Sequence, residues 1–187
     1  MDIQKTAQFL NQPGAVAVIP TDTVYGLAAR AKDVLATENL YELKNREQKP
    51  GTLIAANLKQ LEDLGLKHRY LKAVEQYWPG ALSVVIPCAD PKLEYLHQGK
   101  QSLAVRLPDH NQLIQLLDKT GPLITSSANN SGETPASTIA RAKKVFGDKI
   151  GHYEDGGDLS NKEPSTVIRI LDDAVEVLRE GAVKIEL

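Results

Sequence analysis

The sequence predicts a single α/β domain, of the α+β type, in which helices pack on a twisted mixed β-sheet. Its 187 residues, 42% hydrophobic and 25% charged, are enough for one domain with a substantial core. Runs typical of strands and of helices interleave without strict alternation, which favours a mixed sheet over a regular doubly wound one. No repeat, low-complexity tract or long linker divides residues 1–187.

Caps, stops and hydrophobic spacing predict the individual elements. Asp2 and Asn57 are helix N-caps, whereas Gly65, Gly121 and Gly147 follow helix ends. In chain order we expect a helix from residue 2 to 11, a strand at 15–19, a helix through Leu35, Leu40 and Leu43 to Lys44, a strand at 52–56, helices at 58–64 and 68–77, strands at 81–86 and 102–107, a helix at 109–120, a strand at 123–127, a helix at 135–146, and strands at 165–171 and 174–179 around a tight turn at 172–173.

Composition excludes several classes of protein. The formal net charge is −2, so nothing demands a nucleic acid or an acidic membrane as partner. The polar N-terminal segment lacks a signal peptide's pattern, and no apolar run is long enough to span a bilayer. Cys88 is the one cysteine and has no motif around it, so we expect an inert, buried thiol. These features predict a cytoplasmic protein without a membrane partner.

The familiar catalytic and cofactor motifs are absent from the sequence. It contains no P-loop, no dinucleotide-binding glycine motif, no nucleophile elbow and no Cys/His cluster with the spacing of metal ligands. The four histidines are scattered and are interpreted as surface or structural residues. We therefore expect neither a metal site built by the protein nor a permanent cofactor.

One strand carries a candidate anion site. Side chains alternate along a strand, so Ser102, Ala104 and Arg106 share one face while Leu103 and Val105 share the other. The two small residues leave space beside a guanidinium, which can hold a carboxylate or phosphate with two hydrogen bonds. The alternative is a surface arginine on a half-exposed strand.

Two other strands end in polar residues. Thr125, Ser127 and Asn129 fall in step as one strand runs toward a glycine turn, and Thr21, Thr23 and Tyr25 do so after another. Hydroxyls, an amide and free backbone N–H groups at a strand end suit a phosphate ester or a ribose. An ordinary polar loop is the alternative.

Lys44 and Arg46 form a third candidate, at the end of a predicted helix. Two residues apart on a helix, they would diverge by about 200°. Both could reach one anion only if the chain becomes extended by Lys44. Such a pair is otherwise a solvated helix end.

Six short motifs follow one another along the chain. They are Pro20-Thr-Asp-Thr-Val-Tyr-Gly-Leu27, Lys44-Asn-Arg46, Trp78-Pro-Gly80, Ser102-Leu-Ala-Val-Arg106, Ser127-Ala-Asn129 and Pro164-Ser-Thr-Val167. In this order they resemble the YrdC-type threonylcarbamoyl-AMP synthases, in their short single-domain form. The resemblance covers about residues 10–181, and it is the ordered set that is specific.

The resemblance implies a nucleotidyltransferase with a twisted mixed sheet around a large basic cavity. It would make threonylcarbamoyl-AMP and pyrophosphate from L-threonine, bicarbonate or CO2, and ATP, whose Mg²⁺ is held largely by the phosphates. A tRNA threonylcarbamoyl transferase complex would use the product to modify the adenosine beside the anticodon. By position, the implied threonine contacts are Thr23, Arg106, Thr125 and Ser165, the implied ATP contacts are Arg46, Pro50, Ser102, Ser127, Pro135 and Arg179, and the implied catalytic tetrad is Lys44, Arg46, Ser127 and Asn129.

The sequence also departs from the family pattern and leaves two rivals open. Glu47 replaces a common proline, Pro50 and Ala55 stand where many members carry Asn and His, and Glu180 replaces the proline of an L-R-P-G motif. One rival is a module that binds RNA in the same concavity, and weak RNA binding could also accompany the enzymatic role. The low net charge and 5% aromatic content argue against RNA binding as the main role. The other rival is a relative that acts on a different acyl or carbamoyl phosphate.

Overall fold

The computed structural model describes residues 1–45, 49–171 and 174–185. Its strands are β1 (Val16–Pro20), β2 (Tyr25–Arg30), β3 (Thr52–Ile54), β4 (Leu82–Pro87), β5 (Ser102–Arg106), β6 (Leu123–Ser127), β7 (His152–Tyr153), β8 (Thr166–Leu171) and β9 (Ala174–Arg179). Its α-helices are α1 (Ile3–Leu10), α2 (Val34–Leu43), α3 (Leu58–Leu64), α4 (His68–Val74), α5 (Glu94–His97), α6 (Asn111–Thr120) and α7 (Ile139–Phe146).

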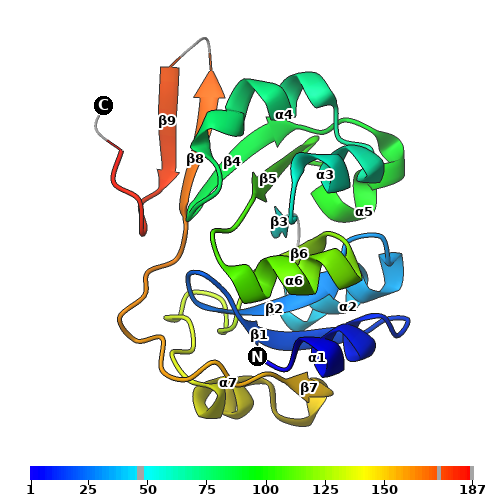
Figure 1. The fold of residues 1–187 in the computed structure, drawn as a ribbon, viewed down its shortest axis with the longest axis vertical. Coiled ribbons are helices and arrows are strands. Elements are labelled where there is room, and N and C mark those ends of the chain that lie inside the picture. Colours follow the sequence, from blue (N-terminus) through cyan, green and yellow to red (C-terminus); the bar gives the residue numbers. More distant parts are fainter. Residues whose placement is uncertain (46–48, 172–173, 186–187) are drawn as a thin grey trace.

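All nine strands join one sheet, in the order β7-β1-β2-β6-β3-β5-β4-β8-β9. The pairs β1–β7, β3–β5 and β4–β8 are parallel, and the remaining neighbours are antiparallel. The predicted mixed sheet is therefore confirmed. Figure 1 shows α3, α4 and α5 beside the β5-β4-β8-β9 half of the sheet, and α1, α2, α6 and α7 beside the β1-β2 half.

Two apolar clusters hold these layers together. The smaller joins Leu10 of α1 and Leu113 and Leu117 of α6 to Ile19 of β1, and each of these side chains is fully buried. The larger runs from β1 and β2 through α2 to β4 and β5. Burial at this scale, at about 25 cal/mol per Å² of apolar surface, is the main force that favours folding. No helix of the described ranges is long and apolar enough to cross a membrane.

Most predicted elements are present, with small differences at their ends. Asp2 and Asn57 cap α1 and α3 as predicted, each accepting a backbone N–H at 3.0 Å. The helix predicted at 135–146 is wrong at its start, because Thr138 caps it by accepting the Arg141 N–H at 3.3 Å. The helix predicted at 68–77 changes to a 3₁₀ turn at Glu75–Tyr77. The turn predicted at 172–173 lies outside the described residues.

Three elements were not predicted: β2, β7 and α5. The omission of β2 matters most, because Tyr25–Arg30 follows a segment that was interpreted only as a polar strand exit. Its Gly and Ala residues have weak strand preference, so no local signal indicates it. It forms because it is buried between β1 and β6 and completes the hydrogen bonding of both.

One row of side chains across the sheet positions the site. Thr125 of β6 pairs with Thr52 of β3, Thr52 with Ala104 of β5, Ala104 with Val85 of β4, and Val85 with Arg169 of β8. Directly paired residues on neighbouring strands face the same side of a sheet. Five strands from distant parts of the chain therefore present these side chains on one face.

Candidate active site

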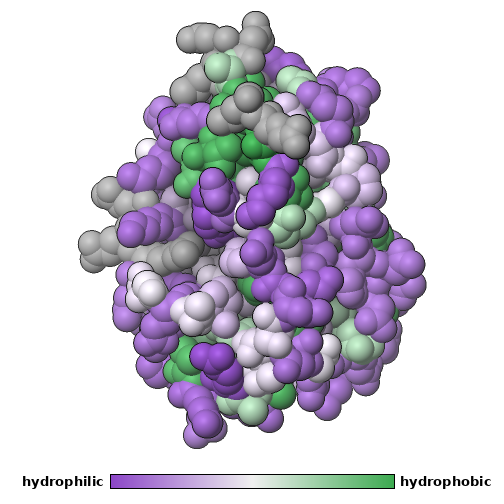
Figure 2. Space-filling model, turned by 90° about the vertical axis from the view of Figure 1, so that its left-hand side faces the viewer, coloured by the Kyte–Doolittle hydropathy of each residue, from purple (hydrophilic) through white to green (hydrophobic). Residues whose placement is uncertain are grey.

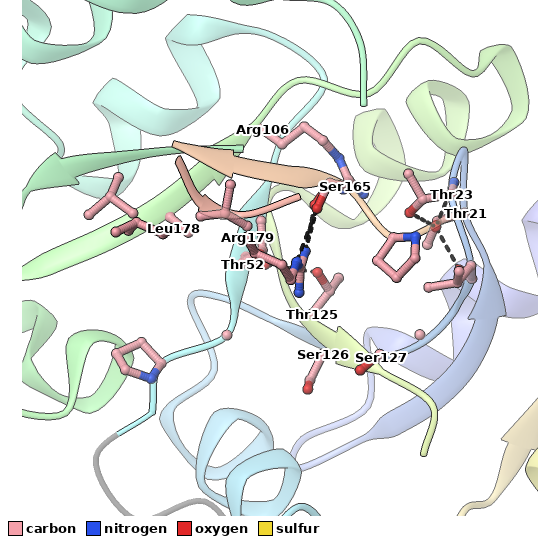
Figure 3. A pocket seen from close by; sticks show the side chains of 18 of the residues that line it. Thr21, Thr23, Thr52, Arg106, Thr125, Ser126, Ser127, Ser165, Leu178 and Arg179 are labelled. Atoms are coloured by element: carbon pink, nitrogen blue, oxygen red, sulfur yellow. Dashed lines mark hydrogen bonds between the residues drawn. The ribbon is translucent and has the colours of Figure 1, made fainter. Parts of the chain in front are cut away.

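A cavity of about 490 Å³ lies over this row of paired residues. Figure 3 shows threonine and serine side chains from several segments lining the same space, with Arg106 at one side and Arg179 at another. All five residues of the row are part of its wall. The described lining is Thr21, Thr23, Val24, Gly26, Pro50, Gly51, Thr52, Val85, Lys100, Ser102, Ala104, Arg106, Thr125, Ser126, Ser127, Pro164, Ser165, Val167, Arg169, Leu178 and Arg179.

The charge of this wall is one-sided. Among the lining residues that the structure describes, Lys100, Arg106, Arg169 and Arg179 are cations, and none is an aspartate or glutamate. Cations that converge on a sheltered space with no opposing carboxylate attract anionic ligands. Figure 2 shows apolar side chains gathered in the upper half of the face on which β8 and β9 lie, and Leu178, 46% exposed, provides an apolar part of the wall.

Arg106 is the most deeply buried cation of the cavity wall, at 4% exposure. Its Nη2 donates a 3.0 Å hydrogen bond to Oδ1 of Asp22, whose side chain is 7% exposed. Burial lowers the pKa of the Arg106 guanidinium and raises the pKa of the Asp22 carboxyl, and in both cases the ion pair opposes the shift. The alternative of a surface arginine is therefore wrong. The predicted face is confirmed, because Ser102, Ala104 and Arg106 line the cavity while Leu103 and Val105 are in the core.

Two threonine pairs belong to the cavity wall, and each is held by a hydrogen bond from a hydroxyl. The Thr21 hydroxyl donates to the Val24 carbonyl at 2.7 Å and lies 3.0 Å from the Thr23 hydroxyl, which donates to it in turn. The Thr125 hydroxyl donates to the Thr52 carbonyl at 2.8 Å. Tyr25 is fully buried and does not line the cavity, although the polar exit interpreted from the sequence included it.

Another part of the cavity wall is built by β8, β9 and Ser165, which precedes β8. Arg179 donates from Nε and Nη2 to the Ser165 carbonyl at 3.1 and 2.6 Å, and from Nη2 to the Ser165 hydroxyl at 3.0 Å. The Ser165 hydroxyl also lies 2.9 Å from that of Ser83 on β4. Arg179 belongs to an exposed edge strand, whereas Ser165 is buried. Figure 3 shows the Arg179 side chain reaching Ser165 from the neighbouring segment.

Lys44 is buried at 3% exposure, and its amine lies behind the wall rather than in the cavity. It donates to the Ser127 carbonyl at 2.9 Å, to Oδ1 of Asn129 at 2.8 Å and to the Asn129 carbonyl. The Ser127 hydroxyl donates to the same Oδ1 at 2.7 Å. The solvated helix end is thus wrong. The helix α2 ends at Leu43, but the chain is not extended at Lys44, whose φ and ψ are −89° and −5°. Whether Lys44 and Arg46 reach one anion stays a prediction, because Arg46 lies outside the described residues.

The other predicted residues divide between the wall and the rest of the molecule. Pro50, Ser102 and Ser127 line the cavity, but Pro135 and Asn129 do not belong to the described lining. Ala55, at the position compared with a family histidine, is fully buried in the core. Arg46 and Glu47 lie outside the described residues. Cys88 is buried away from this lining, and burial raises the pKa of its thiol.

Sequence reasoning missed three charged residues of this region: Asp22, Lys100 and Arg169. Strand alternation could have found Arg169, which is in step with Ser165 and Val167 on a predicted strand. Nothing local indicates Asp22, because its partner Arg106 is 84 positions away. No group of three or more His, Cys, Asp or Glu side chains that could hold a metal occurs within residues 1–45, 49–171 and 174–185.

Comparisons with known proteins agree with this arrangement. The Sua5_yciO_yrdC family model, described as "Telomere recombination", matches residues 9–181. Threonylcarbamoyl-AMP synthase of Bacillus subtilis is 33% identical over 97% of this chain, and that of Marinobacter nauticus is 32% identical over 84%. The structure of Pyrococcus abyssi Sua5 complexed with L-threonine superposes with a TM-score of 0.83 at 30% identity over 96% of this chain.

The relatives differ in length. This chain spans 54% of the Bacillus subtilis protein and 54% of the Pyrococcus abyssi chain, but 86% of the Marinobacter nauticus protein. The matched region includes every segment that lines the cavity. By sequence and by fold, the chain belongs to the Sua5/YciO/YrdC family.

Proposed function

We propose that this protein is an L-threonylcarbamoyladenylate synthase, which makes threonylcarbamoyl-AMP and pyrophosphate from L-threonine, bicarbonate or CO2, and ATP. The observation that carries the proposal is a cavity whose described wall holds four cations and many hydroxyls but no carboxylate. Two of the three substrates, the amino acid and the nucleotide, present anionic groups that such a wall can hold. Relatives at 32–33% identity carry the name of this activity, and one neighbour was crystallised with L-threonine.

Threonine fits the Arg106 end. Arg106 has five N–H donors, and Asp22 accepts from one nitrogen, so donors remain for the carboxylate of the amino acid. Thr23, Thr125 and Ser165 supply hydroxyls on the same wall for the amine and the side-chain hydroxyl. These are the residues that the family resemblance assigned to threonine, and the cavity brings all four together.

ATP fits the side formed by β5, β6 and the β8–β9 hairpin. Ser102, Ser127 and Arg179 line that side, and Pro50 contributes to the adjoining wall. Lys100 and Arg169 add positive charge there. Since the described wall has no carboxylate to ligate it, Mg²⁺ would be held by the phosphates that it accompanies.

The chemistry consists of two condensations. The neutral amine of threonine attacks bicarbonate or CO2. With bicarbonate the products are a carbamate and water, and with CO2 they are a carbamate and a proton that passes to solvent. An oxygen of the carbamate then attacks the α-phosphorus of ATP, the bond to the bridging oxygen breaks, and pyrophosphate leaves. Negative charge gathers on the transferring and leaving groups, so the protein acts by positioning and by electrostatic stabilisation.

Lys44 and Asn129 support the wall that holds the nucleotide. The Lys44 amine binds the Ser127 and Asn129 carbonyls and the Asn129 amide oxygen, and this amide in turn holds the Ser127 hydroxyl. Lys44 is therefore a positioning residue in the ligand-free protein. Its amine is also a buried positive charge bound to the Ser127 carbonyl, and Ser127 lines the cavity, so the charge can favour an anion held there.

A pyrophosphate-release assay with each substrate omitted in turn tests the proposal. ATP cleavage to AMP and pyrophosphate should require both threonine and bicarbonate. Equal turnover without threonine would refute the assignment, and ADP as the product would place the protein with enzymes of a different phosphoryl transfer.

We further propose that the protein works in the cytoplasm and passes its product to a tRNA threonylcarbamoyl transferase complex. Product transfer to a tRNA in a mixture with that complex tests this step.

A further inference from the structure

The buried pair of Asp22 and Arg106 leaves two polar atoms without a partner. Oδ2 of Asp22 and Nε of Arg106 are both buried and make no hydrogen bond in the described structure. The contact between the two side chains is a single hydrogen bond from Nη2 to Oδ1, rather than the paired hydrogen bonds that arginine and a carboxylate usually form. Buried polar atoms of native proteins rarely lack partners, and those that do call for an explanation.

The turn that carries Asp22 is held by hydrogen bonds that do not involve Arg106. Asp22 stands between Thr21 and Thr23, whose hydroxyls are hydrogen-bonded to each other, and the Thr21 hydroxyl donates to the Val24 carbonyl. The Thr23 N–H also donates to the Thr21 hydroxyl at 3.2 Å, so the turn is closed from both sides. The turn therefore places the Asp22 carboxylate independently of its ion pair with Arg106.

The pair is also placed unequally with respect to the cavity. Arg106 lines the cavity, whereas Asp22 is not part of the lining. In Figure 3 the Arg106 side chain extends from the end of β5 toward the Thr21–Thr23 segment, which lies between β1 and β2. A ligand in the cavity thus meets Arg106 and not Asp22, and any effect of Asp22 on that ligand passes through Arg106.

We propose that Asp22 is a positioning residue for substrate binding: it holds one end of the Arg106 guanidinium from behind, so that the other N–H groups face the cavity and bind the carboxylate of the amino-acid substrate. This inference rests on the proposed function, since it takes threonine as the ligand of Arg106. It explains why a carboxylate that forms no part of the described lining is buried against the most deeply buried cation of the cavity wall.

Two substitutions at Asp22 separate orientation from charge. Asp22→Ala removes the acceptor of the Arg106 hydrogen bond, whereas Asp22→Asn keeps an acceptor oxygen of the same size but no charge. Calorimetric titration with L-threonine alone measures binding without turnover. Asp22→Ala should raise the Kd for threonine roughly ten- to a hundredfold, as expected for a lost charge-assisted hydrogen bond, and Asp22→Asn should raise it only about fivefold. The KM for ATP should change less than about twofold in Asp22→Asn, because the positioned group binds the amino acid.

A double-mutant cycle tests whether Asp22 acts through Arg106. In an Arg106→Ala background, Asp22→Ala should add no further loss of threonine affinity, because the group that it positions is gone.

Asp63→Asn is the matched control: Asp63 pairs with Lys59 at 2.9 Å on exposed α3 and lies outside the lining. It should leave the Kd unchanged. Circular dichroism establishes that each variant is folded, and if Asp22→Ala does not fold, Asp22→Asn alone and in the Arg106→Ala background carries the test.

Three results would overturn the inference. Threonine binding as tight as in the wild type in both Asp22 variants would make the pair purely structural. Tighter binding in Asp22→Asn would mean that the carboxylate competes with the substrate for Arg106. If the losses of threonine affinity add up in the double mutant, Asp22 does not act through Arg106. Failure of the proposed function would be seen separately, as a wild-type protein that does not bind threonine at all.

Discussion

Arg106 and Arg179 line the same cavity but are held in opposite ways. Arg106 is on a central strand, almost fully buried and paired with a buried carboxylate. Arg179 is on the edge strand, exposed, and bonded to the carbonyl and hydroxyl of Ser165. One end of the cavity is therefore fixed by the core, while the other depends on a two-strand hairpin at the margin of the sheet.

The difference indicates how binding and stability are divided in this molecule. A buried charge is costly unless it is paired, so any change at Arg106 alters the stability of the fold as well as the affinity of the site. An exposed charge interacts through water and salt, so changes at Arg179 can alter affinity alone. Substitutions in β8 and β9 can therefore change the affinity for ligands with less loss of stability than substitutions at Arg106.

The largest effect is expected from Arg106→Ala. It should leave the Asp22 carboxylate buried without its partner and lower the free energy of unfolding by about 3–5 kcal/mol, with a loss of threonine affinity of roughly ten- to a hundredfold. Urea unfolding and calorimetry measure the two quantities. Adding Asp22→Asn to this variant should restore part of the stability but none of the affinity; a double mutant that is less stable than Arg106→Ala would contradict the buried-charge explanation.

Lys44→Met is expected to come next, since Lys44 is a buried cation behind the wall rather than in it. Methionine retains the apolar stem but leaves the Ser127 and Asn129 oxygens without their donor, which should cost about 1–3 kcal/mol of stability. We expect kcat to fall at least about tenfold with little change in threonine affinity, because the displaced wall holds the nucleotide. Lys72→Met, at a lysine whose side chain is 60% exposed, is the matched control. Normal turnover in Lys44→Met would exclude a role for this lysine.

Arg179→Ala should sharpen the contrast with Arg106. We expect the KM for ATP to rise about tenfold while the free energy of unfolding stays within about 1 kcal/mol of the wild type. ATP binding should weaken with added salt more in the wild type than in the variant, because an exposed charge is screened. A loss of unfolding free energy as large as that of Arg106→Ala would contradict the view that Arg179 contributes to affinity and not to stability.

The smallest effect is expected from Glu176→Ala, which removes a carboxylate from an arginine just as Asp22→Ala does. Glu176 pairs with Arg169 at 2.7 Å, but the two side chains are 46% and 43% exposed. Such surface pairs contribute about 0–1 kcal/mol, so urea unfolding should scarcely distinguish the variant from the wild type. A loss of unfolding free energy near the ~3–5 kcal/mol expected for Arg106→Ala would show that burial does not control the energetics of these pairs.

Much of the fold could be predicted from the sequence because its signals are local. The Asp2 and Asn57 caps, the Gly65 stop and the strand at Leu123–Ser127 each depend on residues within a few positions. The β2 strand could not be predicted, because its Gly and Ala residues have weak strand preference. It becomes a strand only because it is buried between β1 and β6.

In the candidate site, too, local signals could be predicted from the sequence and contacts between distant segments could not. Alternation within one strand placed Ser102, Ala104 and Arg106 on the cavity face correctly, since that requires only the period of a strand. The ion pair from Asp22 to Arg106 and the Lys44 contacts to Asn129 each join segments more than 80 positions apart. Spacing along the chain contains no information about such pairs, so only the assembled sheet identifies them.

The connection from β7 to β8 has a consequence for how the molecule could be divided. Residues 155–163 are exposed except for half-buried Leu159, and Figure 1 shows this segment running along the outside from the lower to the upper part of the fold. A cut within residues 155–163 would yield one fragment that contains Arg106 and the Thr21–Thr23 segment, and a second that contains Ser165 and Arg179. Parallel pairing of β8 with β4 would be the main contact between them. Because each piece holds part of the same cavity, an occupied cavity would favour reassembly, which makes this connection the natural place to split the protein into a two-fragment sensor of its own ligands.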